Sequence, residues 1–353
     1  KEKKRRNFDF SRFSQRHVAF HIAYVGWPYC GFASQAVSPE TVEEHLFAAL
    51  VKTCLINDRN SCSYSRCART DKGVSAASQV ISLRVRSNLK SGLGVVPADG
   101  VAAEGDQPPD DGTKDVTELP YLKMLNGVLP STIRVHGWSP VSADFDARFS
   151  CNGRSYKYFF VKENLDVERM RAAAKYLEGQ HDFRNFCKVD KSKPEQNFER
   201  NIFSFQIDEV ERASESQNDT LCFHIYASAF LWHQVRAMAA VLFLVGAGEP
   251  AETVQRMLDV TACPKKPQYR IAPEEPLLLT QCHFPPGLVN FQADDEGLTR
   301  VEQPLRRQAN EALVRARVME AMLDVVPSKP KGAETVEVDP GRPSKRPRLF
   351  PDV

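Results

Sequence analysis

The sequence predicts an α+β fold made of two halves with largely antiparallel sheets. Both halves contain stretches in which apolar and polar residues alternate as in strands, and both contain apolar residues at helical spacing. These patterns do not follow each other as strict βαβ units, which argues against a parallel sheet. The chain has 353 residues, 42% of them hydrophobic, which is enough for two packed domains.

The N-terminal half is expected at residues 17–148, after a basic arm at residues 1–16. Its first strand is predicted at residues 18–25, with Val18, Phe20, Ile22 and Tyr24 on one face. Ser38 is a suitable N-cap and Pro39 a suitable first residue for a helix that continues through Leu50. The other expected elements are a polar turn at residues 64–73, strands at 79–86 and 133–141, and a short helix at 121–129.

The C-terminal half is expected at residues 149–288. Asp166 is predicted to cap a helix whose buried face includes Met170, Ala173, Ala174 and Leu177. The remaining predicted elements are strands at residues 156–161, 202–210 and 221–229, and helices at 231–245 and 250–258.

Two further segments are predicted to lie outside these halves. Residues 91–118 are acidic and rich in Gly and Pro, which predicts a disordered insertion. Residues 289–353 are predicted to be a mostly disordered tail, with a helix at 308–325. Within this tail the basic run Lys345–Arg348, with Lys329 and Lys331 before it, suggests a nuclear-import signal, so nucleus and cytoplasm are the expected locations. The alternative is a merely basic tail.

Composition narrows the classes of function. The net charge is only +2, so affinity for an anionic polymer cannot be inferred from the total. The nine cysteines include no CxxC pair and have no histidine at zinc-ligand spacing, so no metal site is expected. No apolar run is long enough to span a bilayer, so a protein without membrane partners is expected. No dinucleotide or phosphate-binding loop is present either, so chemistry must come from side chains.

The most informative motif is RCARTDKGVSAASQV, residues 66–80. Asp71 lies between Arg69 and Lys72, and two neighbouring cations would keep its carboxylate ionised by lowering the pKa. Gly73 permits a tight turn that could present the carboxylate at the edge of a cleft. The alternative is an ordinary Arg–Asp–Lys surface turn.

Two more motifs carry aromatic and basic residues. In RSYKY, residues 154–158, Arg154, Tyr156 and Tyr158 share one strand face, so an aromatic ring could stack on an unpaired base while the arginine meets a phosphate. The alternative, which the pattern by itself slightly favours, is a core aromatic pair with a partly exposed arginine.

The third motif is FLWHQVRAM, residues 230–238, at a predicted helix start. It places His233 and Arg236 on one helix face. Because Arg236 lies among apolar residues, it needs an anionic partner. The alternative is an arginine at the edge of the apolar face.

The order and spacing of RTDKGVSA, RSYKY and HQVR resemble the TruA family of tRNA pseudouridine synthases over residues 18–284. The segments YVGWPYCGFASQ, GQHDFRNFCKVD, AFLWHQVRAM and KPQY are similar to the eukaryotic branch that modifies tRNA positions 38 and 39 in the anticodon arm. The resemblance implies two pseudo-equivalent α/β-sandwich halves around a basic central cleft, no cofactor, and tRNA as partner. It also implies a possible homodimer, because bacterial members are homodimers.

The resemblance also implies residue roles. Asp71 matches the catalytic aspartate, Tyr156 the tyrosine that stacks on the target base, and Arg236 the basic residue that pairs with the aspartate. Arg69 matches an arginine associated with nucleotide flipping. Lys72, Arg154 and His233 are further candidates for substrate binding. Ser75 stands where bacterial members usually have His, and Ser78 replaces a common Gly.

The implied reaction leaves alternatives open. Asp71 either attacks the ribose or removes a ribose proton, after which the uracil turns and is rejoined through C5. Other functions to be weighed are a related synthase acting on other tRNA or mRNA uridines, and a non-catalytic tRNA-binding or chaperone protein.

Overall fold

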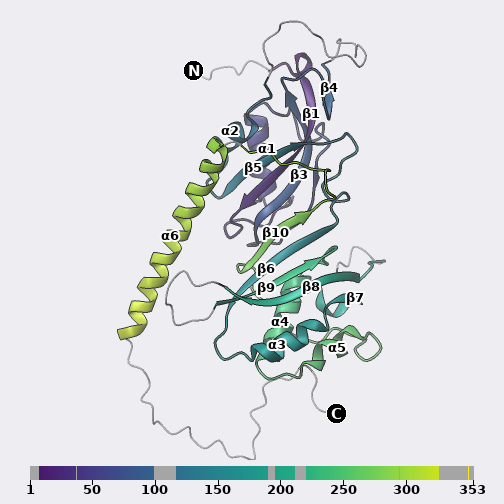
Figure 1. Ribbon diagram of the computed structural model, residues 1–353, viewed down its shortest axis with the longest axis vertical. Helices are drawn as coiled ribbons and strands as arrows, with labels where there is room; N and C mark the ends of the chain where they lie inside the picture. Colours follow the sequence, from purple (N-terminus) through teal and green to yellow (C-terminus); the bar gives the residue numbers. More distant parts are fainter. Residues whose placement is uncertain are drawn as a thin grey trace, which may run out of the picture.

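The computed structural model describes residues 8–36, 38–98, 117–189, 195–210, 220–293, 295–325 and 349. Its framework is one mixed ten-stranded sheet that runs through both halves of the molecule (Figure 1). The coarse prediction of mixed α and β structure with mainly antiparallel strands is confirmed. The two halves share this single sheet and do not carry separate sheets.

The N-terminal half of the sheet is centred on β1 (Ser14–Tyr24) and β3 (Ser75–Ser87), which pair antiparallel over most of their lengths. Two more strands pair with β1, namely β5 (Ile133–Pro140) and the short β4 (Val95–Val96). The two-residue strand β2 (Ser65–Arg66) pairs with β3. The core on this side includes Phe20, Ile22, Phe32 and Leu50, all almost fully buried.

The helices of this half are α1 (Val42–Lys52) and α2 (Tyr121–Asn126), and the 3-10 turn η1 (Phe10–Arg12) precedes β1. The predicted start of α1 is wrong, because its N-cap is Thr41 and not Ser38. The Thr41 hydroxyl accepts from the backbone N–H of Glu44, which is the first half of a T-x-x-E capping box.

The C-terminal half contributes β6 (Gly153–Val161), β9 (Thr220–Ala227), β8 (Glu199–Glu209) and β7 (Gly179–Asp182), in that order across the sheet. Its helical elements are α3 (Val167–Lys175), η2 (Arg184–Phe186), α4 (Gln234–Gly246) and α5 (Glu252–Leu258). Asp166 caps α3 as predicted, accepting from the Arg169 N–H at 3.0 Å. The apolar helix α4 is buried along most of its length, in the second hydrophobic core.

The two halves join through β10 (Leu277–His283), a strand that the sequence did not predict. It pairs antiparallel with β6 and parallel with β3, where Leu278 lies opposite Ser75. Two parallel neighbours begin at the same edge of a sheet. The loops that precede β3 and β10 therefore lie side by side, although about 200 residues separate them in sequence.

The segments predicted to be disordered differ in part from that expectation. In the insertion 91–118, Val95–Val96 pairs with β1, and Glu118 forms an ion pair with Arg16 at 3.0 Å, while residues 99–116 lie outside the described part. In the tail, α6 (Asp295–Val325) is a long helix that begins well before residue 308 and continues through Pro304. The basic run Lys345–Arg348 lies outside the described residues, as do Lys329 and Lys331.

Figure 1 shows α6 running along one side of the molecule, from α2 past the C-terminal half. It contacts α2 and β5 at its N-terminal end, and Arg134 donates to the Arg300 carbonyl at 3.1 Å. Its C-terminal part exposes apolar side chains such as Leu313, Val318 and Met322. None of the helices in the described segments is long and apolar enough to cross a membrane.

Candidate active site

Asp71 lies in the loop between β2 and β3, at the junction of the two halves. A tight turn forms here, in which the Val74 N–H donates to the Asp71 carbonyl at 3.2 Å. Gly73 has φ +78°, a backbone conformation that L side chains rarely adopt. The sequence expectation that Gly73 permits this turn is confirmed, and it leaves the Asp71 side chain about one-fifth exposed.

The loop at residues 24–35 packs directly on this turn. A Cβ built at Gly26 would lie 2.0 Å from the Val74 carbonyl oxygen, so only glycine fits there. The Phe32 N–H donates to the Thr70 carbonyl at 3.1 Å, and the Tyr24 hydroxyl bonds to that of Thr70 at 2.7 Å. These contacts hold the backbone on either side of Asp71 in place.

Arg236 comes to the site from the first turn of α4. Its Nε donates to the Ala272 carbonyl and its Nη2 to the Glu274 carboxylate, both at 2.7 Å. The predicted need for an anionic partner is met, but the partner is Glu274 rather than Asp71. Arg236 therefore acts on Asp71 through space and not by the direct pair that was expected.

Burial dominates the ionisation of Asp71. It raises the pKa to about 6, because a carboxylate loses hydration energy in a partly closed site. The charge of Arg236, a hydrogen bond from the Trp232 side chain and the charge of Lys188 act in the opposite direction, whereas Glu274 adds to the increase. The carboxylate remains mostly ionised at neutral pH.

His233 lies immediately beside Asp71, with 3.6 Å between its Nε2 and Oδ2 of the carboxylate. It precedes α4 with φ 64° and ψ 10°, a left-handed conformation that is unfavourable for a residue with a side chain. Burial and the charges of Arg236, Lys188 and Lys266 lower its pKa to about 4. The imidazole is therefore neutral at pH 7, so this contact is not an ion pair there.

Lys188 and Lys266 are brought next to His233 by a local network. The Lys266 ammonium donates to the Cys187 carbonyl at 2.9 Å, and the Tyr269 hydroxyl donates to the Asn185 carbonyl at 2.7 Å. The Lys188 ammonium lies 4.2 Å from the centre of the Trp232 ring. Residues 185–188 and 266–269 thus pack together, and they place positive charge near His233 and Asp71.

Several known proteins are similar to this chain in sequence. A family model described as tRNA pseudouridine synthase matches residues 173–285. The tRNA pseudouridine(38/39) synthase of Bos taurus is 46% identical over 288 residues, which are 80% of this chain and 58% of the bovine one. The Caenorhabditis elegans protein named "Probable tRNA pseudouridine synthase tag-124" is 37% identical over 327 residues, 92% of this chain and 81% of the other.

This chain belongs to the tRNA pseudouridine synthase family. The resemblance inferred from the three motifs is confirmed. A more distant relative, the tRNA pseudouridine synthase A of Methanosphaera stadtmanae, is 30% identical over 239 residues, 66% of this chain and 71% of the archaeal one. The chain spans less than two-thirds of the length of the bovine relative, and likewise of the human relative.

In this member of the synthase family Tyr156 lies where the two hydrophobic cores meet. It packs against both, and its ring is edge-on to Phe230, with 5.0 Å between ring centres. Burial raises the pKa of its hydroxyl well above the usual value, so the phenol stays protonated. Tyr158, on the same strand, is fully in the core, and its hydroxyl donates to the Pro273 carbonyl.

The structure gives Arg154 a different setting from the predicted phosphate contact. Its guanidinium donates to four backbone carbonyls, those of Cys67, Arg148, Cys151 and Ser228. The group thereby ties the start of the Asp71 segment to β6 and to the end of β9. The guanidinium of Arg154 is therefore used by hydrogen bonds within the fold.

Arg69 and Lys72, which flank Asp71 in sequence, are both exposed. The charges that lower the pKa of Asp71 come from Arg236 and Lys188 instead. The prediction that the flanking cations hold Asp71 ionised is therefore wrong. Adjacent residues in a turn can point apart, whereas folding brings the effective cations from distant segments. The proposed roles of Arg69 and Lys72 in contacting the substrate stay predictions.

Four residues of the site were not among the predicted ones: Lys188, Trp232, Lys266 and Glu274. The first three lie in segments that carried the family resemblance, which was the available signal. No signal in the sequence pointed to Glu274.

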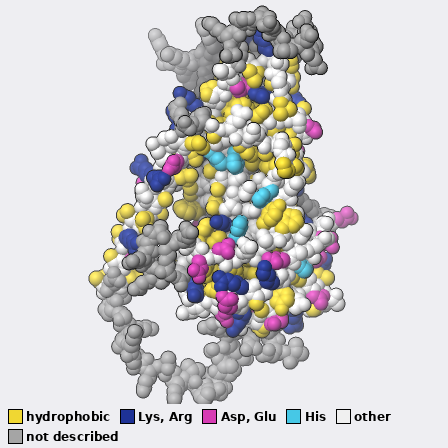
Figure 2. All heavy atoms as spheres, in the orientation of Figure 1, with side chains coloured by type: hydrophobic (Ala, Val, Ile, Leu, Met, Phe, Trp, Pro, Cys, Tyr) yellow, Lys and Arg dark blue, Asp and Glu magenta, His cyan; other side chains and the backbone are white. Residues whose placement is uncertain are grey.

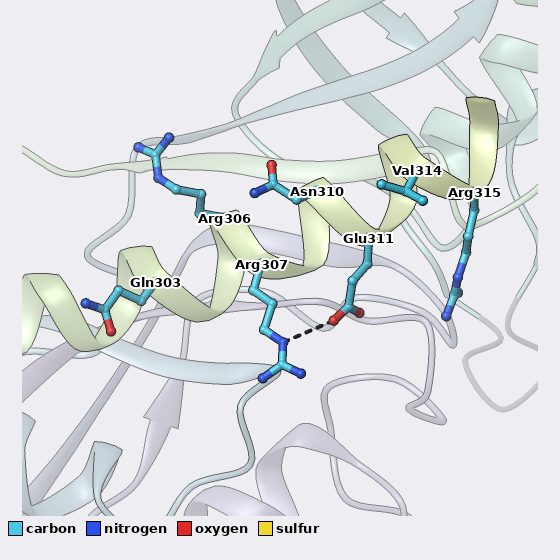
Figure 3. Close-up of a pocket in the computed structure, with 7 residues that line it drawn as sticks. All are labelled: Gln303, Arg306, Arg307, Asn310, Glu311, Val314 and Arg315. Atoms are coloured by element: carbon cyan, nitrogen blue, oxygen red, sulfur yellow. Dashed lines mark hydrogen bonds and ion pairs between the residues drawn. The ribbon is translucent and has the colours of Figure 1, made fainter. Parts of the chain in front are cut away.

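No group of three or more metal-ligating residues occurs within the described ranges. A surface pocket along α6 is lined only by residues of that helix, among them Arg307 and Glu311, whose side chains meet at 3.1 Å (Figure 3). It includes none of the site residues.

Proposed function

We propose that this chain is a tRNA pseudouridine synthase that converts uridine to pseudouridine at positions 38 and 39 of the anticodon arm. Its family membership supports the reaction, and the bovine, human and yeast relatives named tRNA pseudouridine(38/39) synthase support the positions. The observation that carries the proposal is the mostly buried Asp71 carboxylate, held among Arg236, Lys188 and a neutral His233.

The reaction needs no second substrate. The bond between N1 of uracil and C1′ of ribose breaks, the ring turns, and C5 bonds to C1′. The proton at C5 is lost and N1 gains one, so the product has the same composition as the substrate. Asp71 acts on the ribose, either as nucleophile or as base, and both require the ionised form. The charge of Arg236 favours that form.

The target uridine must leave the base stack to reach Asp71. We propose that Tyr156 stacks on it and that Arg69 and Lys72, exposed beside Asp71, contact the displaced strand. Lys188 and Lys266 supply positive charge on the other side of the carboxylate. Together these residues form the basic cleft between the two halves in which the anticodon arm binds.

Two further properties are proposed on resemblance or sequence alone. Self-association as a homodimer follows from bacterial members of the family and is checked by light scattering of the purified chain. A nuclear and cytoplasmic distribution follows from residues 345–348. Neutralising Lys345, Arg346 and Arg348 in a tagged chain should then reduce its nuclear fraction.

The test of the function is pseudouridine mapping by carbodiimide-dependent primer extension. Purified chain is incubated with tRNA transcripts that carry uridine at position 38 or 39, and with matched transcripts carrying cytidine there. Modification should appear only at these uridines, and Asp71→Asn should abolish it while leaving tRNA affinity nearly unchanged, since affinity comes mainly from phosphate contacts.

The possible failures identify the alternatives. Product at other uridines would indicate a related synthase with a different target. Tight tRNA binding without any product would indicate the non-catalytic binding protein. Turnover by pure Asp71→Asn protein would remove Asp71 from the mechanism.

A further inference from the structure

Glu274 contacts both Arg236 and the backbone that follows Asp71. It lies in the loop before β10, next to the loop before β3 because these two strands are parallel neighbours. Its carboxylate accepts from Arg236 at 2.7 Å. Its Cγ lies 2.6 Å from the position that a Cβ on Gly73 would take, so the side chain packs against the backbone two residues after Asp71.

The Arg236 side chain is held in this position by both of its partners. It is only one-tenth exposed, with Nε bound to Ala272 and Nη2 to Glu274. A buried guanidinium with two fixed hydrogen bonds has little freedom to turn towards another anion. By fixing the position of Arg236, Glu274 therefore determines how strongly the charge of Arg236 lowers the pKa of Asp71.

The groups that act on Asp71 come from each segment packed against it. They are Arg236 in α4, Trp232 and His233 just before α4, Lys188 after η2, and Glu274 before β10. Within this set Glu274 is the anion. It opposes the ionisation of Asp71 directly by its charge, and indirectly by neutralising Arg236.

We propose that Glu274 is a positioning residue of the synthase, which holds Arg236 and thereby sets the pH at which Asp71 becomes competent. This inference rests on the proposed function, since it assigns a role relative to Asp71 catalysis. It differs from a purely structural role, in which loss of the Arg236–Glu274 pair would change stability and leave the pH dependence of the reaction alone.

Glu275 provides a matched control for the same chemical change. It is adjacent in sequence and exposed. The Glu275 backbone carbonyl accepts a hydrogen bond from the Trp27 indole at 3.2 Å. A change of the Glu275 side chain leaves this carbonyl in place. Glu275→Gln therefore removes one negative charge from the same loop without touching Arg236.

The experiment is the pH profile of single-turnover pseudouridine formation for the wild type, Glu274→Gln, Glu275→Gln and Glu274→Asp. In Glu274→Gln an anion near Asp71 is lost and Arg236 becomes free to approach the carboxylate. Both changes lower the pKa of Asp71, so the acidic limb should move to lower pH by about half a unit to one unit. Glu275→Gln should keep the wild-type limb, and Glu274→Asp, which keeps the charge, should stay close to it.

An unmoved or upward-shifted limb in Glu274→Gln would overturn the inference, as would an equal shift in Glu275→Gln. A carbon-13 NMR titration of the Asp71 carboxyl, assigned with Asp71→Asn, measures the same shift without requiring turnover. It tests the inference even where a variant is inactive. If the wild type gave no product but the titration shifted, the proposed function alone would fail. If the wild type were active and neither readout moved, the inference alone would fail.

Discussion

Two opposing effects set the behaviour of Asp71. Loss of hydration raises its pKa, nearby positive charges partly reverse this, and the net pKa is about 6. Because the pKa of Asp71 is higher in the folded than in the unfolded state, its ionised carboxylate lowers the stability of the fold. This loss of stability is present at pH values above 6 and is absent below the unfolded-state pKa near 4. The ionised form of Asp71 is thus present at neutral pH although it lowers the stability of the fold.

Asp71→Asn should accordingly stabilise the fold at alkaline pH. At pH 8 its free energy of unfolding should exceed that of the wild type by about 1–3 kcal/mol, and the difference should disappear as the pH falls from 6 towards 4. Urea unfolding at several pH values measures this. Asp208→Asn, an exposed change on β8, is the control and should show no such trend. A variant less stable than wild type at pH 8 would contradict the burial argument.

At the scale of single residues the sequence predicted the turn at Gly73 but not the electrostatics of Asp71. The catalytic role that RTDKG suggests for Asp71 stays a prediction. The motif misassigned the cations, because sequence neighbours in a turn need not face each other, and the charges that matter arrive from α4 and from residue 188. The Arg236–Glu274 pair depends on two loops placed side by side by β3 and β10, a contact for which no local pattern exists.

Among the secondary-structure elements, α1 has a special relation to the site. Its Glu43 is almost fully buried and accepts from the Ser34 N–H, the Tyr64 hydroxyl, Arg59 and Arg66, at 2.7–2.8 Å. Ser34 belongs to the loop that packs on the Asp71 turn, and Arg66 ends β2, which leads into it. One buried carboxylate thus anchors both segments that border Asp71.

Glu43→Gln should destabilise the protein by about 1–3 kcal/mol, because the buried side chain loses its charge-assisted hydrogen bonds and the partly exposed Arg59 and Arg66 lose their anion. Glu44→Gln, which affects only the half-exposed pair with Arg59, should cost less than about 1 kcal/mol. Burial acts to raise the pKa of Glu43, but its hydrogen bonds and the charge of Arg66 lower it below the usual value. The ionised Glu43 carboxylate therefore stabilises the fold at pH values above its unfolded-state pKa, and this stabilisation is lost as the pH falls through its folded-state pKa. Urea unfolding of both variants at pH 7 and in acid checks this, and equal effects would refute the anchoring role.

Most elements were predictable from local patterns, and the failures have physical causes. Alternation located β1, β3, β5, β6, β8 and β9, and helical spacing located α1, α3 and α4. The strand β10 was missed, since a short apolar run between prolines carries no period. It is stabilised by neighbours from both halves, which the local sequence does not encode. The start of α1 was misplaced because Thr41 with Glu44 is a better capping pair than Ser38 with Pro39.

The whole molecule carries a net charge of only +2, which cannot by itself attract a polyanion. Figure 2 shows basic side chains over the lower half of one face, interspersed with acidic ones. The proposed affinity for tRNA therefore requires a few cations concentrated at the proposed binding site. Lys188 and Lys266 are exposed and flank the site residues Trp232 and His233, so they are the strongest candidates.

This argument predicts a specific dependence of tRNA affinity on salt. Each lysine that meets a phosphate releases about one counterion, so Lys188→Gln and Lys266→Gln should each reduce the slope of log Kd against log salt by about 0.7–0.9. Lys175→Gln is the control and should leave the slope unchanged, because Lys175, the last residue of α3, pairs with Glu178 at 3.0 Å. Binding is measured by fluorescence between 50 and 200 mM salt, concentrations at which such contacts are sensitive. The Asp71→Asn background keeps product formation from altering the tRNA during the titration. An unchanged slope for both site lysines, with affinity also unchanged, would mean that the anticodon arm approaches Asp71 from another side.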